Sequence, residues 1–286
     1  MKKFRTVFSL ILIWLLATGV SATELLIPGG QLVGMQLQDD TVTVAAFDET
    51  LGSGAKKCGL QTGDRILRID NTPIHTAQDI RTALAHSDGQ VELAVLRGNK
   101  TKQFRLSPVA TADGPRLGVY LRQGTTGVGT VTYYDPESEA FAALGHGVNT
   151  QNGNLLQMQE GTVFDAEVVQ IKKGTPGTPG QLVGTISHAT PTGTLEKNTN
   201  QGVFGTISAK KSTEPLPVAE KDEVCTGNAT IRSTIGTAGV QEYSVEILKI
   251  YPASKDRTRN LLLKITDPKL LNTTGGIVQG MSGSPI

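Results

Sequence analysis

Two turns rich in small residues carry the side chains in this sequence that could catalyse acyl transfer. Ser282 stands between glycines in Gly280-Met281-Ser282-Gly283-Ser284-Pro285, and His146 stands between glycines in Leu144-Gly145-His146-Gly147. A nucleophilic serine needs a tight turn that exposes its Oγ and aims its own N–H, with a neighbouring N–H, at one point. Glycines permit that geometry, so Ser282 is the candidate nucleophile and His146 the candidate general base.

Other chemistries find little support. The histidines lack the paired spacing of metal ligands, and two cysteines cannot form a four-cysteine zinc site. No Gly-x-x-x-x-Gly-Lys-Ser/Thr string is present for a nucleotide. The 27 basic and 26 acidic residues give a formal net charge of +1, which removes the electrostatic case for nucleic acid. We therefore expect no metal, no cofactor and no nucleic-acid partner. The histidines are His75, His86, His146 and His188.

The N-terminus predicts export. Basic residues precede an apolar run from Val7 to Val20, which spans about 21 Å as a helix and is too short for a bilayer core of roughly 30 Å. Small residues up to Ala22 complete the pattern of a secretory signal over residues 1–22, with an uncleaved anchor as the alternative. Outside the cytoplasm a disulfide is allowed, but Cys58 and Cys225 fall in different predicted domains. We expect two free, buried thiols.

Composition predicts a mainly β protein of about two domains. Glycine (33) and proline (13) are frequent among the 286 residues, and aromatic residues make up only 5%, which favours turns and short strands over long helices. In residues 116–286, alternating apolar segments recur between Gly- and Thr-rich turns, as in a barrel or sandwich, and only stretches such as 136–144 look helical. Residues 109–115 (Val-Ala-Thr-Ala-Asp-Gly-Pro) read as a linker.

Residues 28–108 predict a smaller α+β domain. Arg65 to Ile69 alternates with the period of a half-buried strand. Thr76 and Asp79 form the pattern of a capping box that opens a helix of about residues 77–86. Two further strands, around 91–96 and 101–106, flank Gly98-Asn99, a two-residue hairpin loop.

This order of elements resembles a bacterial PDZ domain of the rearranged type. The resemblance rests on Cys58-Gly59-Leu60, then Gly63-Asp64, then the alternating strand and Asp70-Asn71. PDZ domains bind an extended peptide as an added strand and hold its carboxylate in a nest of backbone N–H groups. The resemblance implies that this nest is formed by Leu32, Val33, Gly34 and Met35, whose pattern is apolar-apolar-Gly-apolar. The alternative is that the glycines form a flexible lead-in.

The remainder of the chain resembles the stage IV sporulation protein B peptidase family. The Gly280–Pro285 segment is similar to the nucleophile loop of chymotrypsin-like proteases, and His146 precedes it in the matching order. The segment from Lys264 to Pro285 is close to that family's signature. The family couples a signal, a PDZ domain and a chymotrypsin-like double β-barrel peptidase domain, so the expected peptidase domain is residues 116–286.

The resemblance assigns roles to single residues. It implies Ser282 as nucleophile, His146 as general base and Asp267 as the acid that orients the base, with the N–H groups of Gly280 and Ser282 as the oxyanion hole. Ser284 is the rival nucleophile. Asp135 and Asp165 are the reserve acids.

The resemblance also implies a biological setting. Such proteases are exported into the space between the forespore and mother-cell membranes, process themselves, with possible self-association in trans, and cleave a membrane-anchored regulator. The cut releases an intramembrane protease that activates a late sigma factor. The partners expected here are therefore a protein substrate and a PDZ ligand.

The sequence stops four residues after Ser282, where the family continues, which predicts a truncated peptidase domain. The alternative function is a non-catalytic adaptor, in which the PDZ domain binds a membrane protein and the β domain is an inert platform.

Overall fold

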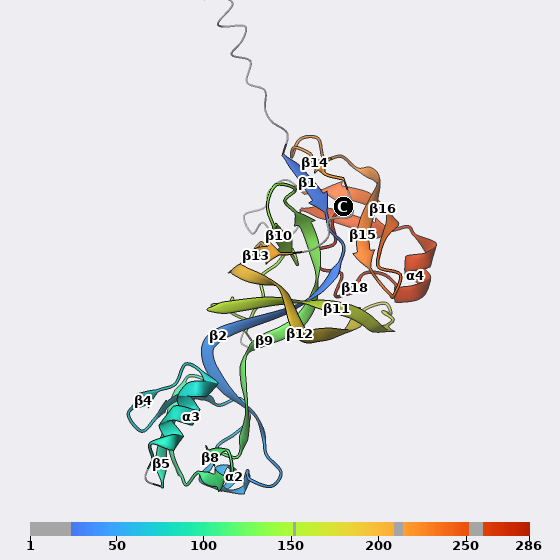
Figure 1. Ribbon diagram of the computed structural model, residues 1–286. Helices are drawn as coiled ribbons and strands as arrows, with labels where there is room; N and C mark the ends of the chain where they lie inside the picture. The colour runs from blue at the N-terminus through green and yellow to red at the C-terminus, as the bar shows by residue number, and fades with distance from the viewer. Residues whose placement is uncertain (1–23, 88, 151–152, 209–213, 252–259) are drawn as a thin grey trace, which may run out of the picture.

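The computed structural model describes residues 24–87, 89–150, 153–208, 214–251 and 260–286. The chain is mostly β and forms two units: a small α+β unit at the bottom of Figure 1 and a larger β unit above it. The predicted signal, residues 1–22, lies outside the described residues. Among those that are described, no helix combines the length and apolar character needed to cross a bilayer.

The larger unit is built on a closed ring of strands. β2 (Leu32–Phe47) pairs with β9 (Val119–Tyr134), and the ring continues through β10, β13, β12 and β11 back to β2. The bounds of these four are Ala140–Ala143, Gly202–Ile207, Gly180–Thr199 and Glu160–Lys172. Alternate residues point inward and fill the ring, among them Met35, Phe141 and Val163. The stretch 136–144 that looked helical therefore contributes a barrel strand, β10.

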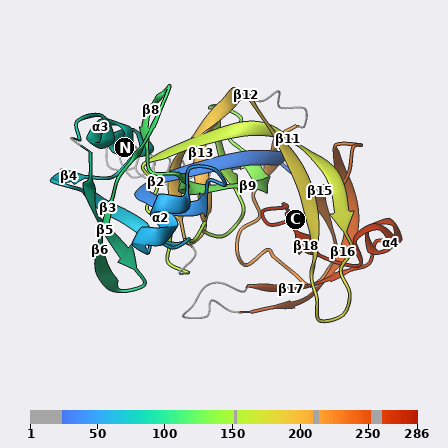
Figure 2. The same ribbon diagram turned by 90° about the horizontal axis from the view of Figure 1, so that it is seen from below.

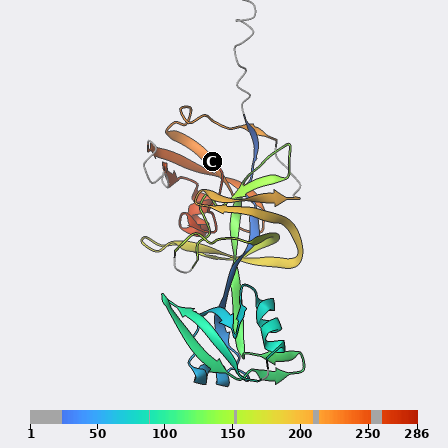
Figure 3. The same cartoon turned by 90° about the vertical axis from the view of Figure 1, so that its left-hand side faces the viewer.

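The α+β unit is an insertion between two strands of this barrel. The β2–β9 ladder runs through both units: Leu32 pairs with Thr130 in the barrel, whereas Phe47 pairs with Val119 in the α+β unit. The ladder shifts register between Leu37 and Val42, where the two units meet, and Figure 3 shows the two strands crossing the junction side by side. The domain boundaries predicted at residues 28 and 108 are therefore wrong. The inserted unit covers about residues 41–123, and the residues before it belong to the barrel.

The inserted unit follows the predicted order of elements. Its bounds are α2 (Ser53–Cys58), β3 (Arg65–Ile69), β4 (Thr72–Pro73), α3 (Ala77–Ala85), β5 (Val91–Arg97) and β6 (Lys100–Leu106). The capping box is present, since Thr76 and Asp79 exchange side-chain-to-backbone hydrogen bonds. The predicted linker 109–115 is wrong: β7 (Val109–Thr111) and β8 (Gly114–Arg116) form a hairpin, and β8 packs against α3.

A second β element covers one flank of the barrel (Figure 2). β15 (Gly227–Thr234), β16 (Val240–Ile250) and β17 (Leu261–Ile265) form a three-stranded sheet. Its buried residues, including Ile231 and Val245, pack against Val168 and Leu182 of β11 and β12. After β17 come α4 (Pro268–Thr274) and β18 (Val278–Gln279), which pairs in parallel with the start of β12. The strands described here do not close into a second ring.

Two short strands, β1 (Leu25–Pro28) and β14 (Leu216–Pro217), extend the sheet at the end of β9. β1 pairs with β14 on one side and with the end of β9 on the other. Both cysteines are free, but only Cys58 is partly covered, and Cys225 is exposed. The expectation of two buried thiols is wrong for Cys225.

A buried ion pair holds the Gly-Asp motif of the inserted unit. Asp64 has no exposed side-chain surface, and the Nε and Nη2 atoms of Arg97 donate to its carboxylate at 2.6 and 2.7 Å. Arg97 Nη2 also donates to the Gly59 carbonyl at 2.8 Å. One guanidinium, from a residue more than 30 positions later in the chain, thus joins Gly59 to Asp64 and satisfies the buried carboxylate.

We predict that Arg97→Leu destabilises the inserted unit by about 3 kcal/mol, because it leaves the buried carboxylate of Asp64 without its partner. Urea-dependent hydrogen exchange of the β3 and β5 amides measures this. Arg105→Leu is the matched control: its side chain is 75% exposed and lies 4.0 Å from Glu92, so its loss should cost less than about 1 kcal/mol. Equal effects of the two substitutions would contradict the assignment.

Candidate active site

Ser282 lies in a tight turn closed by backbone hydrogen bonds. Met281 N–H donates to the Val278 carbonyl at 3.2 Å, and Ser284 N–H donates to the Met281 carbonyl at 3.0 Å. Gly280 and Gly283 both have positive φ, of 104° and 94°. Outside the strand ladders of the described chain, the N–H groups of Gly280 and Ser282 are not donors in any backbone hydrogen bond. The turn can therefore offer these two N–H groups to an oxyanion.

The two serines of this turn have different surroundings. Ser284 Oγ donates to the Met281 carbonyl at 2.7 Å and lies within hydrogen-bond distance of Ser233 Oγ, at 3.0 Å, and Ser233 is fully buried. Ser284 therefore serves to close the turn. Ser282 is half-buried, and its hydroxyl has no hydrogen bond within the described residues. This difference favours Ser282 over Ser284 as the hydroxyl available for reaction.

The turn before His146 is strained. Leu144 has a φ of 73°, which is costly for a residue with a branched side chain, and Gly145 N–H donates back to the Ala143 carbonyl at 3.0 Å. Gly145 also has a positive φ, of 68°. The turn breaks β10 abruptly and leaves His146 on the surface. Strain of this kind is maintained only where the surroundings fix the backbone.

His146 has a defined ring contact. Its Nδ1 atom lies 3.0 Å from the Gly147 carbonyl oxygen. A carbonyl oxygen can only accept, so this contact favours a proton on Nδ1, which in the neutral imidazole leaves Nε2 as an acceptor. That is the tautomer a general base needs.

The two turns are packed against each other. Thr130 of β9 stands between them: its N–H donates to the Ser282 carbonyl at 3.3 Å, and its carbonyl accepts from Leu144 N–H at 3.1 Å. A Cβ on Gly283 would lie 2.4 Å from the Thr130 oxygen and 2.5 Å from Leu144 N, so only glycine fits. The structure thus brings the Ser282 and His146 turns together. Among the described side chains, no hydrogen bond joins Ser282 to His146.

Asp267 lies at the start of α4. Its Oδ1 accepts from Leu270 N–H at 2.8 Å, and Pro268 follows as the first helical residue, which is the arrangement of a helix N-cap. Burial, and then the charge of Asp267, raises the pKa of Tyr243. No hydrogen bond in the described part of the chain joins Asp267 to His146, so its role as the triad acid stays a prediction.

Asp135 and Asp165, the two alternative candidates for the triad acid, lie in a turn and on a barrel strand. Asp135 Oδ1 accepts from Glu137 N–H at 2.8 Å and its Oδ2 from the Ser138 hydroxyl at 2.8 Å, so it shapes the turn before β10. Asp165 is exposed on β11, opposite Val33.

The predicted carboxylate nest is wrong. Leu32, Val33, Gly34 and Met35 are buried in the middle of the barrel ladder, where Gly34 pairs with Val128 of β9 on one side and with Phe164 of β11 on the other. With both edges of the strand paired, these residues cannot accept an added strand. Gly34 instead allows close packing, since a Cβ there would meet Ile186 at 2.5 Å.

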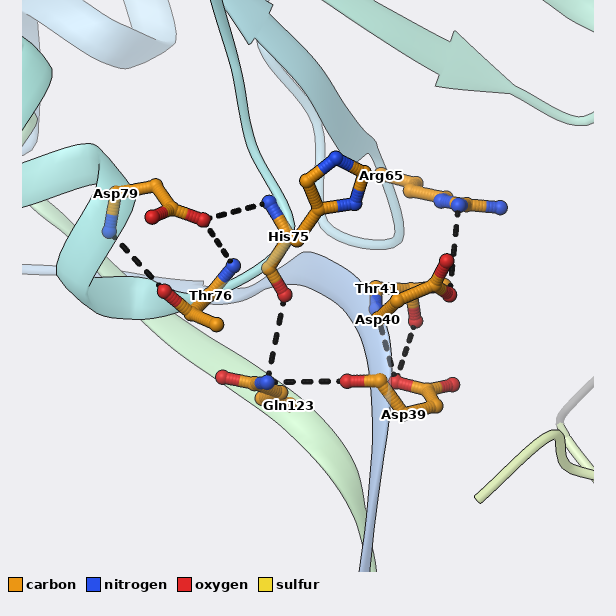
Figure 4. A network of polar contacts seen from close by, with 8 residues as sticks. All are labelled: Asp39, Asp40, Thr41, Arg65, His75, Thr76, Asp79 and Gln123. Carbon is orange, nitrogen blue, oxygen red and sulfur yellow. Dashed lines mark hydrogen bonds and ion pairs between the residues drawn. The ribbon is translucent and has the colours of Figure 1, made fainter. Parts of the chain in front are cut away.

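A free strand edge lies elsewhere in the inserted unit. Residues 119–123 of β9 pair with β2 on one side only. α3 lies beside them: Gln123 Oε1 accepts from Ala77 N–H at 3.4 Å. Gln123 Nε2 donates to the carbonyls of Asp39 at 3.0 Å and His75 at 3.4 Å (Figure 4). The preceding Leu117-Gly118-Val119 has the same apolar-Gly-apolar pattern as residues 33–35, and Gly118 has a φ of 73°. This second apolar-Gly-apolar segment is the sequence signal that could have located the free strand edge.

We predict that Gly283→Ala destabilises the chain by at least about 2 kcal/mol, because its positive φ and the contacts with Thr130 and Leu144 both oppose a Cβ. Gly236→Ala is the control, since nothing lies within 4 Å of a Cβ there and its φ is ordinary. Its effect on the free energy of unfolding should stay within about 0.5 kcal/mol. Urea unfolding followed by circular dichroism compares the two, and a tolerated Gly283→Ala would show that the turns are not in contact.

No group of three or more His, Cys, Asp or Glu side chains placed to hold a metal ion occurs among the described residues.

Comparison with known proteins finds a match for each of the two units. A family model described as SpoIVB peptidase S55 matches residues 113–286, and a PDZ domain model matches residues 51–97. The chain is 38% identical over 63 residues to a Clostridium perfringens protein that carries the provisional name of a zinc metalloprotease, covering 22% of this chain and 19% of that protein. A Helicobacter pylori protein with the same provisional name is 26% identical over 151 residues, covering 49% of this chain and 41% of that protein.

The chain thus spans about a fifth and about two fifths of the length of these two curated relatives. Among solved structures, the PDZ domain of an SdrC-like protein from Listeria monocytogenes matches with 22% identity and a TM-score of 0.25, covering 29% of this chain and 87% of that one. The S55 model covers more than half of the sequence. The chain belongs to the SpoIVB peptidase S55 family and carries a PDZ domain, matched over residues 51–97, before the residues 113–286 that the peptidase model matches.

Proposed function

We propose that this peptidase is a serine endopeptidase with Ser282 as its nucleophile. The observation that carries the proposal is the Ser282 turn, which can offer two N–H groups to an oxyanion and is packed against the turn that presents His146. This combination is what acyl transfer from a peptide requires: a hydroxyl, a base and donors for the developing oxyanion.

The residues act in sequence on one peptide bond. His146 Nε2 takes the proton of Ser282 Oγ as that oxygen attacks the scissile carbonyl carbon. The carbonyl oxygen becomes an oxyanion and accepts from the N–H groups of Gly280 and Ser282, each contributing about 3 kcal/mol in comparable enzymes. His146 then returns the proton to the leaving amine as the C–N bond breaks. Water, deprotonated by His146, releases the acyl group from Ser282.

Asp267 is the proposed acid of this triad on the family resemblance. Its Oδ1 is used as a helix cap, so its Oδ2 would have to reach His146 Nδ1 in the substrate complex. Catalytic hydrogen bonds often tighten only when substrate is bound.

We propose that the substrate and partner are extended polypeptides. A strand edge at residues 119–123 offers backbone groups to a peptide, as in other cases of strand addition. Family membership supports self-processing and cleavage of a membrane-anchored regulator of sporulation, after export into the space between the forespore and mother-cell membranes. The basic and apolar start of the sequence supports export.

We predict that a fluorophosphonate probe labels the full-length protein and that Ser282→Ala abolishes both labelling and self-cleavage. His146→Ala should lower the labelling rate by at least about 100-fold, because the hydroxyl loses its base. Ser284→Ala is the matched control, since that hydroxyl only closes the turn, and it should keep its label. Self-cleavage that persists in Ser282→Ala would exclude the proposed function.

We predict that Asp267→Asn lowers kcat by at least about 100-fold without changing the melting temperature, because asparagine caps a helix as well as aspartate but cannot hold the protonated imidazole. Asp267→Ala should also cost about 1 kcal/mol of stability through the lost cap. If Asp267→Asn keeps full activity, Asp267 is a helix cap alone, and the Gly147 carbonyl is what orients His146.

The alternative is an adaptor that binds a peptide without cutting it. The free β9 edge beside α3 is the observation that favours it. An adaptor would bind peptide equally well with Ser282→Ala and would never take up the fluorophosphonate.

A further inference from the structure

Thr130 is a buried residue that holds both turns of the candidate active site. It lies in β9, has no exposed surface, and pairs with Leu32 of β2. Its hydroxyl Oγ1 donates to the Gly280 carbonyl at 2.7 Å, and its N–H donates to the Ser282 carbonyl at 3.3 Å. Its own carbonyl accepts from Leu144 N–H at 3.1 Å. All three of its polar groups are therefore used on the two turns.

The two carbonyls that Thr130 binds belong to the residues proposed to bind the oxyanion. Each of these carbonyls lies in the peptide plane that follows its residue, so the hydrogen bond from Thr130 fixes the ψ angle of Gly280 and of Ser282. Fixing both carbonyls on the buried side removes the freedom of these two residues to rotate. Because Gly280 has a positive φ and carries no side chain, nothing in the residue itself would otherwise restrict it.

We propose that Thr130 is the positioning residue of the oxyanion hole. This inference rests on the proposed serine mechanism and adds to it a residue that touches no substrate. Its role is to keep the Gly280 and Ser282 N–H groups aimed at one point before substrate binds, since such donors work only when they are preorganised. Through Leu144 it also fixes the distance between this turn and the strained turn that presents His146.

The role of Thr130 depends on its hydroxyl group and not only on the shape of its side chain. Valine matches threonine in shape but has no donor, so Thr130→Val would leave the Gly280 carbonyl buried without a partner. Thr130→Ser keeps the donor. Thr132, two residues along the same strand, provides a matched control because its buried Oγ1 has no hydrogen-bond partner in the described structure. Thr132→Val therefore removes the same hydroxyl with no hydrogen bond lost.

The test compares these three variants in the full-length protein with a peptide substrate. Active sites are first counted by stoichiometric fluorophosphonate labelling, so that kcat refers to folded, reactive protein only. We expect Thr130→Val to lower kcat per labelled site about tenfold, with KM within twofold of the unsubstituted protein, and Thr130→Ser to restore most of it. Affinity for a peptide aldehyde, whose adduct places an oxyanion in the same site, should fall in parallel with kcat/KM.

Hydrogen exchange gives a readout that does not depend on turnover. Thr130→Val should accelerate exchange of the amides in the Gly280–Ser284 turn by about tenfold, and Thr132→Val should leave them unchanged. Unchanged kcat per labelled site in Thr130→Val, or an equal loss in Thr132→Val, overturns the proposal while leaving the serine mechanism intact. Failure of the unsubstituted protein to label overturns the serine mechanism and the proposal with it.

Discussion

The antiparallel pairing of β2 with β9 is the interaction on which the rest of the molecule depends. One ladder runs from Leu32–Thr130 in the barrel to Phe47–Val119 in the PDZ region. Its barrel half closes the ring of strands and gives the core its shape. Its outer half forms the PDZ sheet together with β3. Because the same two strands run through both units, the barrel and the PDZ region are joined by paired strands at the junction.

The ladder also explains how strained turns can exist at the site. The positive φ of Leu144 and the close contacts around Gly283 are unfavourable in free energy. Interactions within the turns themselves do not offset this cost, so the surrounding structure must do so. Both turns are fastened to Thr130, in the strand that is paired with β2 at that point. The two turns of the candidate active site are thus anchored on a fully buried residue, and rigid elements of this kind keep functional groups in place.

The sequence predicted the features that depend on interactions between residues close together in the chain. The strand Arg65–Ile69 and the capping box of Thr76 and Asp79 came out as expected, because alternation and capping involve residues close in sequence. The turns around Ser282 and His146 could be suspected from their glycines for the same reason.

Features decided by long-range pairing were not predicted. Residues 33–35 and 117–119 carry the same apolar-Gly-apolar pattern, yet the first is buried in the barrel and the second opens the strand beside α3. Residues 109–115 were predicted to be a linker because Asp113 and Gly114 are typical of turns. In the structure these two residues lie at the turn of the β7–β8 hairpin. Thr130 gave no signal, since a threonine in a strand is ordinary and its hydroxyl acquires a role only when Gly280 arrives from the far end of the chain.

The insertion of the PDZ region between the barrel parts of β2 and β9 has a consequence for how the chain folds. Leu37 and Thr125 are paired neighbours, yet the whole inserted unit separates them along the chain. Closing a long unstructured loop costs conformational entropy, by about 0.6 kcal/mol for each doubling of its length. An inserted unit that has already collapsed around its own core brings its two ends together and removes most of that cost. The order of events during synthesis thus favours the PDZ region first, with the later strands adding to a pair of strands that it has already joined.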